Sequence, residues 1–450
     1  MTVADPANDF GTLVVGGAQA TVKDANGIVL GASTLSGGLN LVAKGAVAQS
    51  GTLNFGGSSS LDAGAANDVT LLNPANSFAL LAIPNARDAL IDVTGDTNLG
   101  AVSTARDLRV EDASGDISGG QAISVVRNAT FDTGAGNDVT LPSGGNRFGG
   151  DVTVSGRNAT INAGTPLSLG GTTLTGTLDA AAASISQAGA ITVGHTVTLV
   201  SGPGAIALPN GANDFLGPVR LSTAPGQNAT VTDSNDLTLG QSTVSGNLMA
   251  TAAKTLAVPA STAVHAVGTA TLVSDAQAPA APTIGNGGVV MGPGANLQSS
   301  GGPIAIFTAK RSQNSIDPTA TFNGSKFKPG PLFINTNREV WGTYYPAGSA
   351  ISPFTIFYKD KGKAAPQTKL THPKKRWVTA KRHAKIKFAF TSPTANALFL
   401  CKLDRRPLRL CKSPFHASVK PGKHRFLVRA ELGTVVDPTP AKVKFKVVRR

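Results

Sequence analysis

Acidic residues gather in one stretch of the chain, and clustered carboxylates are the first feature that could do chemistry. They are Asp92, Asp96, Glu111, Asp112 and Asp116. Enzymes that cleave polysaccharides by hydrolysis use two carboxyl groups on either side of the scissile bond. The neighbouring residues here are Gly and Ser of turn-like segments. We therefore interpret these carboxylates as corners of a structural repeat and expect no catalytic residue.

A second candidate for chemistry is a metal-binding loop. Gly134–Asp138 reads Gly-Ala-Gly-Asn-Asp, which matches half of a calcium-binding nonapeptide repeat. Calcium-binding repeats of this kind recur every nine residues, whereas the nearest similar segment lies around Asp68, 70 residues away. We expect a corner turn and no metal site.

Other signatures of catalysis are missing from the sequence. The six histidines, at positions 195, 265, 372, 383, 416 and 424, are scattered, and His424 is expected to face a core. No nucleophile elbow, metalloprotease motif or phosphate-binding loop occurs. We predict that the chain is not an enzyme and uses no cofactor and no small-molecule substrate.

Positive charge is concentrated near the C-terminal end. The chain has 40 Lys and Arg against 26 Asp and Glu, a formal net charge of +14. Residues 1–357 hold 15 basic and 22 acidic residues, whereas residues 358–450 hold 25 and 4. The sequence therefore joins an acidic part of net charge −7 to a basic part of net charge +21.

Within the basic part, cationic residues alternate with apolar ones. The cations are Lys385, Lys387, Arg425, Arg429, Lys442, Lys444 and Lys446. This alternation predicts antiparallel strands with one buried and one cationic face. These seven residues are our candidate polyanion-binding residues, because clustered Lys and Arg attract phosphate and carboxylate groups. The alternative is a solvated face on which lysines prevent edge-to-edge pairing. No fold signature of specific nucleic-acid recognition is present.

The acidic part contains an internal repeat of about 70 residues. An Asn stands two residues before a Phe in the pairs Asn8/Phe10, Asn76/Phe78, Asn146/Phe148 and Asn213/Phe215, with the phenylalanines 68, 70 and 67 residues apart. A Leu-Gly pair recurs with its glycine at positions 31, 100, 170 and 240. Residues 67–71 recur as residues 137–141. Three landmarks therefore share one period.

Short β-like segments fill each period. Examples are Ala20–Asp24, Leu39–Ala43, Val152–Val154, Ala159–Ile161, Thr196–Val200 and Ala229–Val231. They are rich in Val, Ile, Leu and Thr and are bounded by Gly, Asn, Asp or Ser, which indicates strands and turns. Similar strands return about every 20 residues (Thr21, Asn40, Leu61), the circumference of one coil of a parallel β-helix.

These patterns predict an all-β fold, a parallel β-helix (solenoid) over residues 1–304. Each 70-residue period should hold three coils. Roughly fourteen coils stacked at about 4.8 Å would form a rod of about 70 Å. Alternate side chains should enter a narrow core, and Gly and Asn should occupy the corners. A β-sandwich of the same strands is the alternative, but it does not require a fixed period.

Aromatic residues are scarce before residue 305 and frequent after it. Ten of the 23 lie in residues 305–358: Phe307, Phe322, Phe327, Phe333, Trp341, Tyr344, Tyr345, Phe354, Phe357 and Tyr358. Large rings can cover the last coil, so we expect an aromatic cap here. A stacking platform for sugar rings is the functional alternative.

Several motifs resemble a known repeat family. They are Asn-Asp-Phe-Gly at residues 8–11, Leu-Gly-x-Ser-Thr-x-Ser-Gly at residues 30–37, a similar stretch at residues 239–246, and residues 185–191. These stretches resemble filamentous haemagglutinin-type repeats of bacterial adhesins and autotransporter passengers. The resemblance implies a β-helical stalk of a secreted or cell-surface protein. It implies no particular ligand and supplies no binding residue.

The basic part resembles a bacterial immunoglobulin-like module. The motifs are Leu400–Asp404, Cys411–Pro414, residues 422–430 and Asp437–Ala441, in that order. The resemblance implies an Ig-like β-sandwich over residues 366–450 and a disulfide between Cys401 and Cys411. A disulfide is typical of an oxidising, extracellular setting. Two unpaired core thiols are the alternative. The segment Glu431–Val436 departs from the usual polar turn of such modules.

Membrane insertion and export signals are not visible in the sequence. No stretch approaches 18 consecutive apolar residues, so we expect no membrane span. Residues 1–10 carry Asp5 and Asp9 and do not resemble a signal peptide. Because the first landmark falls at residue 8, inside a repeat, we expect the natural polypeptide to begin upstream of Met1.

Together these observations predict four parts: a solenoid (1–304), its cap (305–358), a linker (359–365) and a basic Ig-like sandwich (366–450). The predicted function is a non-enzymatic, adhesin-like protein, secreted or on the cell surface, whose cationic module contacts cell-wall or surface polyanions or glycans. One alternative is an inert spacer or a fragment of a larger adhesin. Another, of a different class, is a β-helix enzyme that acts on polysaccharides.

Overall fold

The computed structural model describes residues 1–112, 114–276, 287–326, 339–341, 354–359, 366–371, 375–379, 381–394, 397–432, 435–437 and 439–450. Within them the regular structure is β, apart from one short 3-10 helix, Arg311–Gln313. No helix in this part of the chain is long and apolar enough to cross a bilayer. The chain divides into two compact units. The first comprises Met1–Phe327 and Tyr345–Ile356, and the second Lys328–Tyr344 and Phe357–Arg450.

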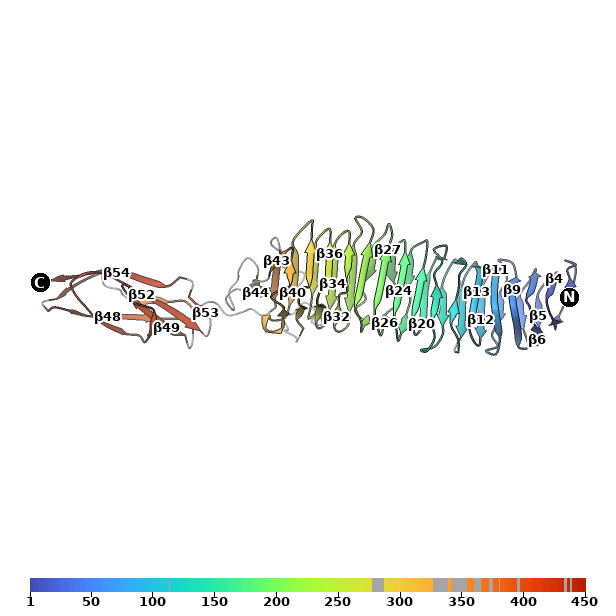
Figure 1. Cartoon of the computed structure of the whole chain (residues 1–450), viewed down its shortest axis with the longest axis horizontal. Helices are drawn as coiled ribbons and strands as arrows, with labels where there is room; N and C mark the ends of the chain where they lie inside the picture. Colours follow the sequence, from blue (N-terminus) through green and yellow to red (C-terminus); the bar gives the residue numbers. More distant parts are fainter. Residues whose placement is uncertain are drawn as a thin grey trace. The chain divides into compact units, whose positions relative to one another are not determined.

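The first unit is a parallel β-solenoid of about 15 turns, as the repeat predicted. Figure 1 shows its strands stacked in coil order from β4 (Ala20–Asp24) onward. One coil consists of β4, β5 (Ile28–Leu30) and β6 (Ser33–Leu35), after which β7 (Leu39–Ala43) returns to pair with β4 in parallel. Alternate residues of β4 and β7 are buried. The inward side chains form a narrow apolar core, as a two-residue periodicity requires.

We expected each 70-residue repeat to hold three coils. In the structure each repeat instead holds three coils and one further strand. From Ala20 the parallel pairing leads to Leu39, then Ser59, then Leu81, three coils later. Ala89, the repeat equivalent of Ala20, begins β12 (Ala89–Val93), the strand after Leu81. The reason is that three coils use only about 60 residues, so the remaining residues form one more strand.

The later repeats have the same offset. The pairing runs from Ala89 through Leu108 and Ala129 to Val152. Ala159 then begins the following strand, β21 (Ala159–Asn162). It runs again from Ala159 through Leu178 and Val197 to Val219, before β31 (Ala229–Asp233) begins. Since three strands make a coil, each repeat is turned by one face of the solenoid relative to the repeat before it.

The Asn of the first landmark is a buried cross-link between coils. Asn146 is fully buried, and its Oδ1 accepts the backbone N–H of Ile123 at 2.9 Å. Its Nδ2 donates to the carbonyls of Leu141 at 3.2 Å and Asn162 at 2.9 Å. One amide therefore satisfies backbone groups of three successive coils. Equivalent bonds are made by Asn76 and Asn213.

The glycine of the Leu-Gly landmark lies where the preceding coil approaches closely. A Cβ at Gly31 would lie 2.6 Å from Cγ2 of Val14, and one at Gly170 would collide with Oγ1 of Thr153. The hydroxyl two residues later is buried: Ser33 Oγ donates to the Gly31 carbonyl at 2.8 Å and accepts from the N–H of Val15 at 3.0 Å. The Leu-Gly motif therefore lets two neighbouring coils approach closely at a corner and links them by a hydrogen bond.

Part of the aromatic segment packs into the solenoid unit. Phe322 is fully buried and stacks on Phe354, with ring centroids 4.7 Å apart. All five residues of β45 (Phe354–Tyr358) are buried. Phe327, Phe333, Tyr344, Tyr345 and the side chain of Trp341 lie outside the described residues, as does the predicted linker beyond Lys359. A complete aromatic cap stays a prediction.

The second unit consists of two sheets that share one core. The smaller has the order β46 (Lys369–Thr371), β48 (Ala384–Thr391), β51 (Phe415–Val419). The larger has the order β47 (Arg376–Thr379), β54 (Ala441–Arg449), β52 (Gly422–Leu432), β49 (Leu398–Leu403), β50 (Arg409–Cys411), with β53 (Val435–Val436) beside β52. The rings of Phe388 on β48 and Phe426 on β52 stack between the sheets at 4.0 Å.

Candidate functional site

The seven predicted polyanion-binding residues all lie on strands of the second unit, with side chains on the outer faces. Lys385 and Lys387 lie on β48, Arg425 and Arg429 on β52, and Lys442, Lys444 and Lys446 on β54. Six are exposed and Arg429 is partly buried. The alternation with buried Ile386, Phe388, Phe426, Val443 and Phe445 confirms the predicted two-sided strands.

The structure divides these cations between two opposite faces. Lys385 and Lys387 belong to the smaller sheet, whereas the other five belong to the larger one. The two sheets pack on each other through their inner faces, where Phe388 meets Phe426. Outward side chains of the two sheets must therefore point in opposite directions. Five of the seven share a surface, and Lys385 and Lys387 lie on the far side.

On the larger sheet, cations of neighbouring strands stand directly opposite one another. The register between β52 and β54 pairs Arg425 with Lys444, and Lys423 with Lys446. Like charges in such positions are destabilising unless an anion is present. Lys423 was not among the predicted residues, although it alternates with the buried positions of β52 in the same way as Arg425.

These cationic pairs border an open depression of about 1070 Å³ at the end of the larger sheet. We call it the cationic hollow. Its cations come from four places: Lys375 before β47, Arg405 and Arg406 after β49, Lys423 and Arg425 on β52, and Lys444 and Lys446 on β54. Asp404, His424 and Phe445 complete the lining. Sequence reasoning missed Lys375, Arg405 and Arg406 because they lie in turns, where no alternation marks them.

His424 and Asp404 form a hydrogen-bonded pair in the lining of the hollow. His424 Nδ1 lies 2.8 Å from Asp404 Oδ2, and Nε2 lies 2.9 Å from the carbonyl oxygen of Lys420. A carbonyl can only accept, so Nε2 is a donor, and the carboxylate makes Nδ1 a donor as well. Both nitrogens therefore carry protons in this arrangement. The ring also stacks on Phe445, with the ring centroids 5.3 Å apart, and His424 is partly buried at the edge of the core.

The pKa values of this pair move apart. Burial alone would lower the pKa of His424, but its hydrogen bonds to Asp404 and to the Lys420 carbonyl outweigh burial and raise it above 6.5. Burial alone would raise the pKa of Asp404, but the bonds from His424 and from the backbone N–H of Arg425 outweigh it and lower the pKa. The ion pair is therefore favoured near neutral pH.

A disulfide joins Cys401 of β49 to Cys411 of β50, with the two Cα atoms 5.8 Å apart. This is the pairing that the Ig-like resemblance implied. The bond closes the hairpin that carries Asp404, Arg405 and Arg406. It therefore limits the motion of one wall of the cationic hollow.

In the solenoid the five clustered acids lie in three different settings. Asp92 and Glu111 lie mid-strand rather than at corners, on paired strands, and both form ion pairs with Arg109. Asp112 is fully buried and accepts bonds from Thr97 and from the backbone of Ser114 and Gly115. Burial raises the pKa of Asp112, and these bonds oppose that effect.

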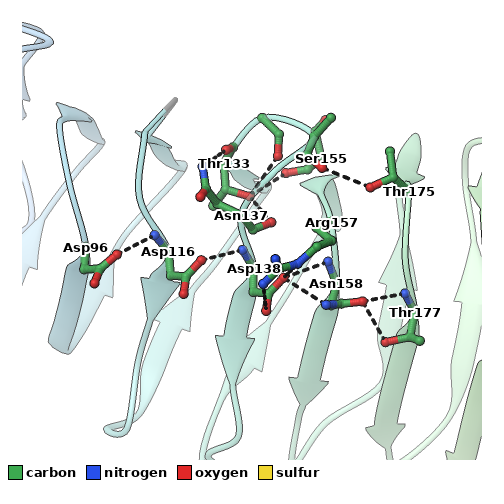
Figure 2. Close-up of polar contacts among 12 residues, drawn as sticks. Asp96, Asp116, Thr133, Asn137, Asp138, Ser155, Arg157, Asn158, Thr175 and Thr177 are labelled. Atoms are coloured by element: carbon green, nitrogen blue, oxygen red, sulfur yellow. Dashed lines mark hydrogen bonds and ion pairs between the residues drawn. The ribbon is translucent and has the colours of Figure 1, made fainter.

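The other two acids belong to a corner ladder that runs from coil to coil (Figure 2). Asp96 Oδ1 accepts the backbone N–H of Asp116 at 3.1 Å, and Asp116 Oδ1 accepts that of Asp138 at 2.8 Å. The ladder continues through Asn158 to Thr177. Asp96 and Asp116 are therefore corner residues, as predicted.

The calcium-like segment is part of the same corner. Asn137 Nδ2 donates to the carbonyl of Thr133, and Asp138 forms two bonds with Arg157, each 2.8 Å long (Figure 2). The hydrogen bond from Arg157 lowers the pKa of Asp138. Asp68 and Arg87 form the same pair one repeat earlier. In the part of the chain that the structure describes, no three His, Cys, Asp or Glu side chains are grouped to hold a metal ion.

Four consecutive segments of the chain match one family, described as repeats of unknown function (DUF5649): residues 17–83, 86–155, 156–222 and 226–286. Together they cover more than half of the chain. The chain belongs to the DUF5649 family. Each DUF5649 segment begins three residues before one of the equivalent strand starts Ala20, Ala89, Ala159 and Ala229. One DUF5649 repeat is therefore three coils and one strand of this solenoid.

The DUF5649 match ends at residue 286 and does not extend to the basic second unit. Neither a curated protein nor a solved structure matches the chain. The resemblances to filamentous haemagglutinin-type repeats and to an Ig-like module therefore stay predictions from the sequence motifs.

Proposed function

We propose that this DUF5649 protein is a non-enzymatic, adhesin-like protein, secreted or on the cell surface, whose solenoid is a stalk and whose basic unit contacts polyanionic polymers. The observation that carries the proposal is the set of cations on the larger sheet of the second unit. Among the described residues, no ion pair neutralises Arg425, Lys444 or Lys446. Such a surface attracts polymers that bear phosphate, sulfate or carboxylate groups.

The solenoid supplies an internal comparison for this argument. Several of its arginines lie beside carboxylates, although among the described residues Arg147 and Arg220 do not: Arg87 contacts Asp68, Arg106 contacts Asp88, Arg127 contacts Asp107 and Arg157 contacts Asp138. Most arginines of the solenoid are thus neutralised within the chain. Among the described residues of the second unit, Arg425, Lys444 and Lys446 have no such ion pair, which favours a partner outside the chain over a purely structural role.

The turn of each repeat by one face supports the stalk function. A residue exposed on one face of the solenoid has its equivalent in the following repeat on the adjacent face. Equivalent residues of successive repeats therefore do not line up along a single face. Polymer-binding solenoids use extended surfaces built from repeats on one side. The same observation favours the second candidate function, an inert spacer or a segment of a larger adhesin.

Three further observations support an Ig-like module at the cell surface. The strand order of the two sheets, with β48 beside β51 and β52 between β49 and β54, is that expected of an Ig-like sandwich. β47 pairs in parallel with β54 and extends the larger sheet by one strand. The disulfide suits an oxidising compartment, which favours export.

The test is binding of the whole chain to immobilised dextran sulfate and to neutral dextran, from about 50 mM to about 500 mM salt, because salt screens exposed charges. We expect binding to dextran sulfate alone, weakened at least about tenfold across this range. Lack of binding at the lowest salt would favour the inert spacer. Release of shortened chains from acidic polysaccharides would overturn the non-enzymatic proposal.

A further inference from the structure

The cationic hollow of the second unit is more than a charged surface. It combines a concave shape of about 1070 Å³ with seven Lys and Arg residues from four separate segments. Ligand sites of proteins commonly measure about 300–1,000 Å³. The hollow is therefore larger than one phosphate or sulfate ion needs, and it suits several linked charged groups.

Among the described residues that line the hollow, the one carboxylate is already occupied. Asp404 accepts bonds from His424 Nδ1 and from the backbone N–H of Arg425, both at 2.8 Å. Among the described residues, no carboxylate lies within ion-pair distance of the seven cations. The protein therefore holds adjacent positive charges at some cost in stability, and a bound polyanion would relieve that repulsion.

The rings that line the hollow exclude one class of polyanion. His424 and Phe445 stack on each other, and Phe445 is only 4% exposed. Proteins that bind single-stranded nucleic acids offer free aromatic faces on which bases stack. No such face is offered here. The lining therefore favours a ligand that is recognised through its charges.

Three of the seven cations are arginines, which form paired hydrogen bonds with oxyanions. Arg405 and Arg406 project from the turn that the disulfide hairpin carries, and Arg425 lies on the neighbouring strand. The arginines thus come from two walls of the hollow, and the lysine pair Lys423 and Lys446 comes from adjoining strands. This arrangement can grip oxyanions spaced along a chain.

We propose that the cationic hollow is a docking site for a linear glycan that carries sulfate or phosphate groups. This proposal rests on the proposed polyanion-binding function and assigns it to one place. His424 acts as a positioning residue: its two donated bonds tie the Asp404 turn to the segment around Lys420. The His424–Asp404 pair is surrounded by the seven cations of the hollow: Lys375, Arg405, Arg406, Lys423, Arg425, Lys444 and Lys446.

The experiment compares two double variants of the full chain that remove the same charge. Lys423→Gln/Lys446→Gln removes a cross-strand pair of the hollow. Lys369→Gln/Lys412→Gln removes two exposed lysines of the same unit that do not line it. The probes are dextran sulfate and a phosphorylated mannan, with calorimetric titration at fixed salt. A cooperative melt of each variant, at or above the melting temperature of the native chain, would show that both variants fold.

We expect the hollow variant to weaken binding at least about tenfold, as the loss of two charge-assisted contacts implies, and the control variant by less than about threefold. The slope of log binding constant against log salt concentration reports the number of counterions released on binding. For the hollow variant this number should be smaller by about two than for the native chain. The probe that binds more tightly identifies sulfate or phosphate as the preferred group.

A third variant tests the arginine geometry. Arg405→Lys/Arg406→Lys keeps both charges but removes the planar fork, so we expect weaker binding with an unchanged salt dependence. Equal losses in the hollow and control variants would overturn the docking site while leaving polyanion binding intact. No binding by the native chain would instead overturn the proposed function. Tighter, hollow-dependent binding of single-stranded DNA would overturn the glycan assignment.

Discussion

At the scale of single residues, a few buried polar side chains determine how coils stack. Asn146 bonds to backbone groups of three coils, and the corner ladder of Asp96 and Asp116 passes one N–H per coil to a carboxylate. Backbone groups at the corners of a solenoid lie outside the strand ladders. Side-chain amides and carboxylates supply the missing partners.

Replacing Asn146 should therefore destabilise the solenoid far more than the small size of the asparagine side chain suggests. We expect Asn146→Ala to lower the free energy of unfolding by on the order of 3 kcal/mol, because one buried N–H and two buried carbonyls lose their partner. The control is Asn54→Ala, an exposed position on β9 (Leu53–Asp62). Thermal melts of both variants measure the difference, and equal shifts would contradict the cross-linking role.

Asp233 gives the solenoid a specific dependence on pH. Its carboxyl is buried, and burial raises its pKa to about 6, although it accepts the backbone N–H groups of Phe215 and Asn235. The folded state therefore holds the proton more tightly than the unfolded chain, whose pKa is 3.8. The stabilisation is complete below about pH 4 and is lost as the pH rises through about 6.

Asp233→Asn should remove this dependence. Relative to the native chain, the variant should gain stability between pH 4 and pH 7, by on the order of 3 kcal/mol. The measurement is the melting temperature of both proteins at several pH values. Asp179→Asn, at an exposed position of β24 (Leu178–Ala182), is the control. A difference between variant and native chain that does not change with pH would contradict the prediction.

At the scale of elements, alternation in the sequence located the strands well. Predicted Ala20–Asp24 and Leu39–Ala43 are β4 and β7 with identical bounds, and the alternating cationic segments are β48, β52 and β54. Buried and exposed positions follow directly from a two-residue period. The turns that carry Arg405 and Arg406 were missed as site elements, because a turn shows no such period.

The β49–β50 hairpin is the element whose stability depends on a covalent bond. The two cysteines are separated by 10 positions in the sequence, and closing so short a loop contributes about 2–3 kcal/mol. We expect Cys401→Ala/Cys411→Ala to lower the melting temperature of the second unit and to leave that of the solenoid unchanged. Calorimetry resolves the two transitions, and an equal shift of both would contradict independent folding of the units.

At the scale of the whole molecule, the repeat length and the coil length do not match. Three coils and one strand make up one DUF5649 repeat, so the sequence repeats after about 70 residues while the fold repeats after about 20. A solenoid is stabilised by contacts between neighbouring coils. The number of repeats should therefore be adjustable, provided that each junction joins equivalent strand starts.

Deleting residues 89–158 tests this view. The deletion places Ala159 directly after Asp88, in the position of its repeat equivalent Ala89. We expect a folded, shorter solenoid with unchanged circular dichroism per residue, since each coil still meets a compatible neighbour. Deleting residues 89–93 instead removes β12 alone and displaces every later strand by a face. That variant should misfold or aggregate, and a cooperative melt for it would contradict the register argument.

The amino-acid sequence by itself determined the period, the strands, the inward and outward positions, and the separation of acidic from basic parts. Each of these depends on the order of residues along a short stretch of chain. Only the tertiary structure decided that a repeat turns by one face, that Lys385 and Lys387 lie opposite the other cations, and that three turn residues join the hollow. These features depend on which distant strands pair and which sheets pack together, and local periodicity carries no record of either.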